Sequence, residues 1–149
     1  MLDYYNLIRT NVQILNVELV TLECRKSENI SGELDVDLNI ERKVGSIDKE
    51  KGEIYLESKF EAKNEDGVMI SVFSVFKGYC KSTSDTLEEE DFKSYLYEQV
   101  VPLLLPYARE CIASTMTRMN LQPFYIPTMD VLSSLKVNKE GDLVNEPEV

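Results

Sequence analysis

The spacing of apolar residues changes about two-thirds of the way along this sequence. Before that point apolar and polar residues alternate, most cleanly at residues 34–41 and 54–63, as in strands with one face in water. After it, apolar residues recur at helical spacing over residues 101–116. Strands followed by helices predict an α+β fold.

The first part of the chain predicts four strands in all. Residues 12–21 nearly alternate, and a slip in the alternation at residues 15–16 predicts a β-bulge. Residues 64–67 (Asn-Glu-Asp-Gly) predict a hairpin turn, because Gly67 tolerates a positive φ. Residues 68–76 are apolar on both faces, which indicates a strand that is covered on both sides or faces another subunit. No helix intervenes, so we expect one antiparallel sheet.

The second part of the chain predicts a long helix. Acidic residues 88–91 suit a first helical turn, and residues 101–116 are apolar over so wide a surface that burial on more than one side is expected. Pro102 and Pro106 each remove a backbone donor. The sequence leaves open whether one kinked helix or two short ones result.

Beyond the long helix, a connection at residues 120–128 leads to a second predicted helix at residues 129–136. The polar, acidic residues 138–149 are expected to be disordered. We therefore expect one domain over residues 1–137. The sequence has no apolar run of membrane-spanning length and begins without a basic flank or cleavage site, so a cytoplasmic location is expected.

Composition excludes several classes of function. The chain has no histidine, which rules out Ser-His, Cys-His and HExxH chemistry. Its 16 Lys and Arg against 27 Asp and Glu, a net charge of −11, argue against binding to nucleic acid or to anionic membranes. Cys24, Cys80 and Cys111 are too widely spaced for a zinc motif and are expected to be reduced. We predict a protein that is not an enzyme and has no cofactor or metal.

The run Leu-Pro-Tyr-Ala-Arg-Glu-Cys-Ile at residues 105–112 resembles the first-helix signature of the protein-export chaperone family SecB. Residues 33–39 are similar to the family's second strand, and residues 120–135 are similar to its connecting loop and second helix. The resemblance covers residues 10–136. It implies a four-stranded antiparallel sheet followed by two helices, assembling as a homotetramer (a dimer of dimers) with the first helices sandwiched between sheets.

The function that the resemblance implies is ATP-independent holding of unfolded polypeptides, such as secretory precursors, in an apolar groove for protein export. The implied client-binding residues are Leu34, Val36, Leu38, Leu121, Phe124, Tyr125, Ile126, Met129, Leu132 and Leu135. The implied oligomer interface is Val101, Leu105, Ala108, Ile112 and Met116. Ordinary core is the alternative reading of the groove residues. For Phe124 and Tyr125 the groove is favoured, because a loop between prolines is a poor place to bury two aromatics. Arg109 and Glu110 are expected to be structural.

The resemblance leaves the partner open. In members that deliver clients to the ATPase SecA, acidic residues on the first and fourth strands contact SecA. Here Thr21, Arg25 and Val72 stand at the expected positions, and Glu18, Glu23 and Glu28 offer acids in a shifted register. Solitary SecB-like proteins instead serve as chaperones of antitoxins in toxin–antitoxin systems.

Two other classes of function remain as alternatives. One is a hotdog-type thioesterase or small-ligand carrier, for which Glu110 is the candidate acid. The other is an adaptor that binds one folded partner.

Overall fold

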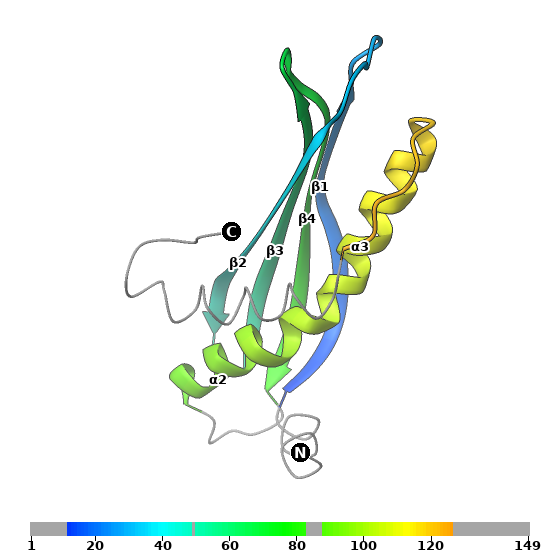
Figure 1. Ribbon diagram of the computed structural model, residues 1–149. Coiled ribbons are helices and arrows are strands. Elements are labelled where there is room, and N and C mark those ends of the chain that lie inside the picture. The colour runs from blue at the N-terminus through cyan, green and yellow to red at the C-terminus, as the bar shows by residue number, and fades with distance from the viewer. Residues whose placement is uncertain (1–11, 49, 83–87, 127–149) are drawn as a thin grey trace.

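One antiparallel sheet forms the body of the molecule. The computed structural model describes residues 12–48, 50–82 and 88–126. The strands are β1 (Val12–Lys26), β2 (Asp35–Asp48), β3 (Lys51–Asn64) and β4 (Gly67–Ser82), in the order β1-β4-β3-β2 (Figure 1). The predicted four-stranded antiparallel sheet is confirmed, with strands longer than the alternation alone indicated.

A continuous helical run crosses one face of this sheet (Figure 1). It consists of α2 (Glu89–Tyr95), a π-helical turn η1 (Leu96–Val100) and α3 (Val101–Arg118). Pro102 lies in the first turn of α3 and Pro106 lies inside it, so the two prolines do not divide the chain into separate helices. The second helix predicted at residues 129–136 and the tail at residues 138–149 lie outside the described residues.

The π-helical turn is joined to β2 through one arginine. The Val101 amide donates to the Leu96 carbonyl, and Pro102 has no N–H to offer the next carbonyl, that of Tyr97. The Arg42 guanidinium supplies the missing donor: its Nη1 lies 3.2 Å from that oxygen, and its Cζ lies 5.0 Å from the centroid of the Tyr97 ring. A polar side chain of the sheet therefore compensates for the donor that Pro102 removes.

The core lies between the sheet and the helical run. Alternate side chains of β3 and β4 face α3, and a helical stripe of α3 faces them. Fully or almost fully buried members of this core are Ile54, Leu56, Phe60, Val72, Leu104, Leu105, Ala108 and Ile112. Burying each of the larger side chains contributes about 1.5–3 kcal/mol, so this layer supplies most of the hydrophobic stabilisation.

Two local predictions for the sheet are confirmed. The turn at residues 64–67 has Gly67 at φ 117°, and the Asp66 amide donates to Asn64 Oδ1 at 2.8 Å. The register of β1 against β4 shifts between Ile14 and Asn16, where the slip in alternation predicted a bulge. A second shift, between Leu19 and Thr21, was not predicted.

Candidate functional site

The loop after α3 turns back along the helix. Asn120, at φ 59°, ends α3 in the left-handed conformation. The Asn120 amide donates to the Thr117 carbonyl at 3.0 Å, and the Leu121 amide donates to the Met116 carbonyl at 2.9 Å. This is the Schellman arrangement, which reverses the chain direction. Residues 121–126 then run beside α3 rather than away from the molecule (Figure 1).

The two aromatic residues of this loop point in different directions. Phe124 is half-buried, and its ring centroid lies 4.9 Å from that of Phe60 on β3. Tyr125 is 57% exposed and lies beneath the Arg109 guanidinium of α3, with 5.4 Å from Cζ to the ring centroid. Ile126 is 1% exposed and belongs to the core. One end of the loop is thus anchored inside while Tyr125 stays at the surface.

Strand β2 carries two of the predicted client-binding residues, Val36 and Leu38. Val36 pairs with Ala62 and Leu38 pairs with Phe60, so both side chains lie on the sheet face that carries α3. Val36 is 52% exposed, whereas Leu38 is half-buried and packs against the core. Phe60, the register partner of Leu38, contacts Phe124, so this residue of β3 lies between β2 and the loop. We name this region the β2–loop surface: Leu34, Val36, Leu38, Leu121, Phe124 and Tyr125.

Six of the ten predicted client-binding residues are thus described with part of their surface exposed, in β2, just before it or in the loop, and their role in client binding stays a prediction. Ile126 is also described, but it presents almost no surface. Met129, Leu132 and Leu135 lie outside the described residues. The sequence reasoning did not assign Phe60 or Arg109 to the site. Phe60 was detectable only as a core-facing residue of an alternating strand, and the contact between Arg109 and Tyr125 carried no sequence signal.

The five predicted interface residues of α3 pack within the protomer. Their exposed fractions range from 0% for Val101, Ala108 and Ile112 to 2% for Leu105 and 4% for Met116. They form core against the chain's own sheet, so a contact between copies would have to use other side chains of α3. Their direct part in a subunit interface stays a prediction.

The described residues contain no group of His, Cys, Asp and Glu side chains suited to a metal ion. Burial raises the pKa of the Cys80 thiol to about 12 and also raises that of Cys111, which keeps both protonated and unreactive at neutral pH. Glu110, the candidate acid of the thioesterase alternative, is exposed on α3. What the arrangement offers is apolar surface for binding.

Comparison with known proteins identifies the family. The family described as preprotein translocase subunit SecB matches residues 7–135. The chain belongs to the SecB family. Among solved structures, the SecB-like chaperone Rv1957 of Mycobacterium tuberculosis, in complex with a ChAD peptide from the HigA1 antitoxin Rv1956, matches with a TM-score of 0.68 and 17% identity. That match covers 80% of this chain and 91% of the other, and it shows that the fold is SecB-like.

Two further comparisons add little. A Streptococcus agalactiae protein of unknown function matches with a TM-score of 0.40 and 8% identity, covering 78% of this chain and 96% of that one. The comparison with curated protein sequences gave no match. In the part of the chain that the structure describes, no helix is long and apolar enough to cross a bilayer.

The three residues that stand at the family's SecA-contact positions lie on two different faces of the sheet. Thr21 and Arg25 lie on the face opposite α3, next to Val75 and Ser71 of β4. Val72 does not: it is 0% exposed and faces α3, because side chains alternate along β4. An acid at that position would lie in the core. The resemblance places Val72 where SecA-delivering members carry an acid, and in this chain that position belongs to the core.

Strand β1 carries two acids on the face opposite α3, Glu18 and Glu23. Glu18 accepts a hydrogen bond from the Tyr79 hydroxyl at 2.9 Å, and Glu23 lies opposite Phe73. Hydrogen bonding to Tyr79 and Tyr55, with Glu53 nearby, holds the pKa of Lys77 above its ordinary range. The Lys77 ammonium therefore stays positively charged in the middle of the face. Farther along the same face, a hollow of about 530 Å³ is lined by Glu23, Cys24, Arg25, Lys59, Ser71 and Phe73.

Proposed function

We propose that this SecB-family protein is an ATP-independent chaperone that holds unfolded polypeptides on the β2–loop surface. The observation that carries the proposal is the pairing of exposed with anchored apolar groups. Val36 and Tyr125 are 52% and 57% exposed, while Phe124 packs against the ring of Phe60, which is the register partner of Leu38. A preordered apolar surface of this kind accepts many sequences, because it imposes no shaped pocket.

The position of β2 adds a second reason. β2 is an edge strand, so one side of its backbone has no strand partner within the described sheet. An extended client segment laid along that edge would gain backbone hydrogen bonds whatever its sequence, and its alternate side chains would contact Val36 and Leu38. Unfolded chains provide such extended segments, whereas folded proteins rarely do.

The client class has two candidates. The family's description as preprotein translocase subunit favours secretory precursors, with export through SecA. The structural match to a chaperone bound to an antitoxin peptide favours an antitoxin segment as a dedicated client. Both are unfolded polypeptides, and both would use the same surface. No acid on β4 adjoins Thr21 or Arg25, where the neighbours are Val75 and Ser71, and this favours the dedicated client.

We also propose that copies of the chain assemble as a homotetramer. Strand β1, at the other edge of the sheet, exposes Leu15, Leu19, Val20 and Leu22. On α3, Leu103 and Tyr107 are exposed, and the Tyr107 ring also reaches the sheet, where its centroid lies 6.0 Å from that of Phe76. Apolar groups gathered in this way on one chain are commonly covered by another. The buried residues of α3 would then support the interface from beneath.

The proposal is tested by aggregation of guanidinium-denatured rhodanese on dilution, followed by light scattering with and without ATP. The wild-type protein should suppress aggregation equally in both conditions. Val36→Asp places a charge on the exposed part of the surface and should weaken client affinity about tenfold. Val68→Asp is the matched control, because Val68 is 43% exposed and adjoins the β3–β4 hairpin instead.

The molecular mass of wild type and of each variant is measured in solution alongside that assay. Wild type and both variants should have the mass of about four protomers, which separates loss of client binding from loss of assembly. A wild-type protein that leaves rhodanese aggregation unchanged would overturn the chaperone proposal. A mass of one protomer would overturn the assembly.

A further inference from the structure

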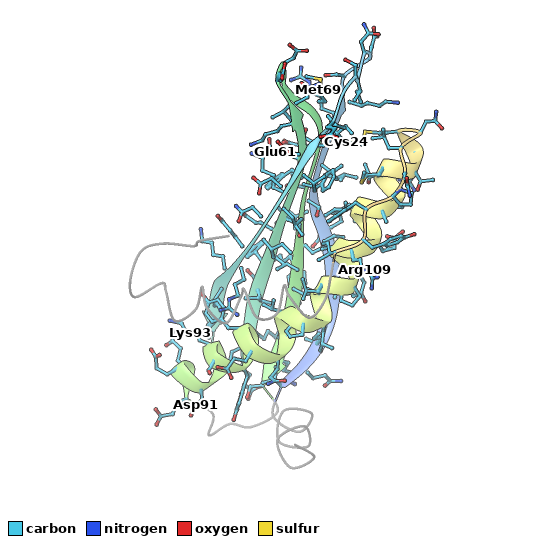
Figure 2. The ribbon with its side chains drawn as sticks, viewed as in Figure 1. Cys24, Glu61, Met69, Asp91, Lys93 and Arg109 are labelled. Carbon is cyan, nitrogen blue, oxygen red and sulfur yellow. The ribbon has the colours of Figure 1, made fainter. Side chains whose placement is uncertain are left out.

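Arg109 is the residue of α3 that reaches the loop. The buried stripe of α3 includes Leu105, Ala108 and Ile112, and Arg109 lies one helical step beyond it, where its side chain is exposed. Figure 2 shows Arg109 about midway along α3, on the part of the helix that the loop passes. Its guanidinium carbon is 5.4 Å from the centroid of the Tyr125 ring.

The contact matters because the loop is held unevenly. Leu121 is fixed by its hydrogen bond to Met116, Phe124 by the ring of Phe60, and Ile126 by burial in the core. Tyr125 is 57% exposed, and the guanidinium is the one cation over its ring among the described residues. Without that contact the Tyr125 side chain would be free to rotate, and a client would have to order it on binding.

We propose that Arg109 is a positioning residue for client binding, holding the Tyr125 ring at the edge of the β2–loop surface so that the surface is ordered before a client arrives. This inference rests on the proposed function. The interaction is a cation–π contact, so it requires a positive charge at position 109 and an aromatic ring at position 125. A packing role for the arginine would require neither.

The first test needs no client. The chain contains no tryptophan, so Tyr125→Trp introduces a single indole fluorophore into the loop. Adding Arg109→Met, which keeps the length and removes the charge, should lower the fluorescence anisotropy of this indole and raise its quenching by acrylamide. Arg109→Lys should restore both. Arg118→Met is the control, because Arg118 is an exposed arginine of the same helix that lies over no described ring.

The second test measures binding of fluorescein-labelled, reduced and carboxymethylated α-lactalbumin, which is permanently unfolded. Arg109→Met should raise the dissociation constant about two- to five-fold, the effect of losing one exposed cation–π contact. In a Tyr125→Ala background the same change should have no further effect. Arg109→Lys and Arg118→Met should bind like wild type, and every variant should keep a cooperative thermal unfolding transition.

The outcomes separate this inference from the proposed function. If wild type binds the unfolded chain and Arg109→Met binds equally well, the positioning role is wrong while the chaperone proposal stands. An equal loss with and without Tyr125 would also contradict the positioning role. If wild type does not bind at all, the proposed function fails and takes the client-binding role of Arg109 with it.

Discussion

At the residue scale, Phe124 and Tyr125 show what decides whether an aromatic side chain is exposed. The two are neighbours between Pro123 and Pro127, and sequence reasoning placed both on a binding surface. Only Tyr125 is largely exposed, because Phe124 packs against the Phe60 ring. That contact depends on the register of β3 beneath the loop, which no local pattern encodes. Phe124→Asp would therefore disturb packing against Phe60, whereas Val36→Asp changes an exposed side chain of the proposed binding surface.

Cys80 makes a prediction about pH. Burial raises the pKa of its thiol from an ordinary 9.0 to about 12, so the folded state keeps its proton while the unfolded chain loses it. The contribution of the protonated Cys80 thiol to the free energy of unfolding is complete below pH 9 and declines as the pH rises toward 12. The free energy of unfolding should therefore fall above pH 9, with about 1.4 kcal/mol per pH unit coming from this group.

The measurement is denaturant unfolding between pH 8 and pH 10.5, in a Cys24→Ser background that removes the exposed thiol. Cys80→Ala should be less stable than its parent at pH 8, because it leaves a cavity. The difference in free energy of unfolding between the two proteins should narrow as the pH rises, since alanine carries no proton to lose. If the free energy of unfolding changed equally with pH in the two proteins, the raised pKa of Cys80 would be contradicted.

At the element scale, the helical run was predictable in its content but not in its continuity. The acids at residues 88–91 and the helical spacing at residues 101–116 located it correctly. The effect of Pro102 was left open because it depends on Arg42, a residue of β2 that is distant in sequence. Strand β1 was likewise predictable only in part. Its first bulge was visible in the alternation, but the second, between Leu19 and Thr21, left no break that the pattern could show.

Arg42→Met should destabilise the fold by about 1–3 kcal/mol, because the Tyr97 carbonyl loses its charged donor in a partly buried place. Chemical denaturation measures the change. Lys43→Met is the matched control, since Lys43 is the next residue of β2 and is exposed. Its effect should lie within about 0.5 kcal/mol of zero. A similar loss in the two variants would show that Arg42 does not anchor the helix.

At the scale of the whole molecule, the strand count, the antiparallel pairing and the helix-covered face followed from alternation and short turns. The order β1-β4-β3-β2 did not, because alternation fixes which side chains share a face and says nothing about which strands are neighbours. This order matters for the site. It places β2, which carries Val36 and Leu38, at one edge and β1 at the other edge, where the exposed leucines suggest contact with another copy.

The candidate site was partly predictable for the same reason. Leu34, Val36 and Leu38 could be assigned to one strand face, and the loop could be recognised as apolar. The contact between Phe124 and Phe60 could be seen only in the packed structure, as could the burial of Ile126 in the core. The anchoring of Tyr125 by Arg109 required it as well.

The most direct test of the account is to find where an unfolded client lies. Reduced and carboxymethylated α-lactalbumin carrying a benzophenone group can be photocrosslinked to the protein and the adducts mapped by mass spectrometry. We expect adducts within residues 34–38 and 121–125, and their loss in Val36→Asp. Adducts concentrated on the opposite face of the sheet, around Lys59 and Phe73, would contradict the account.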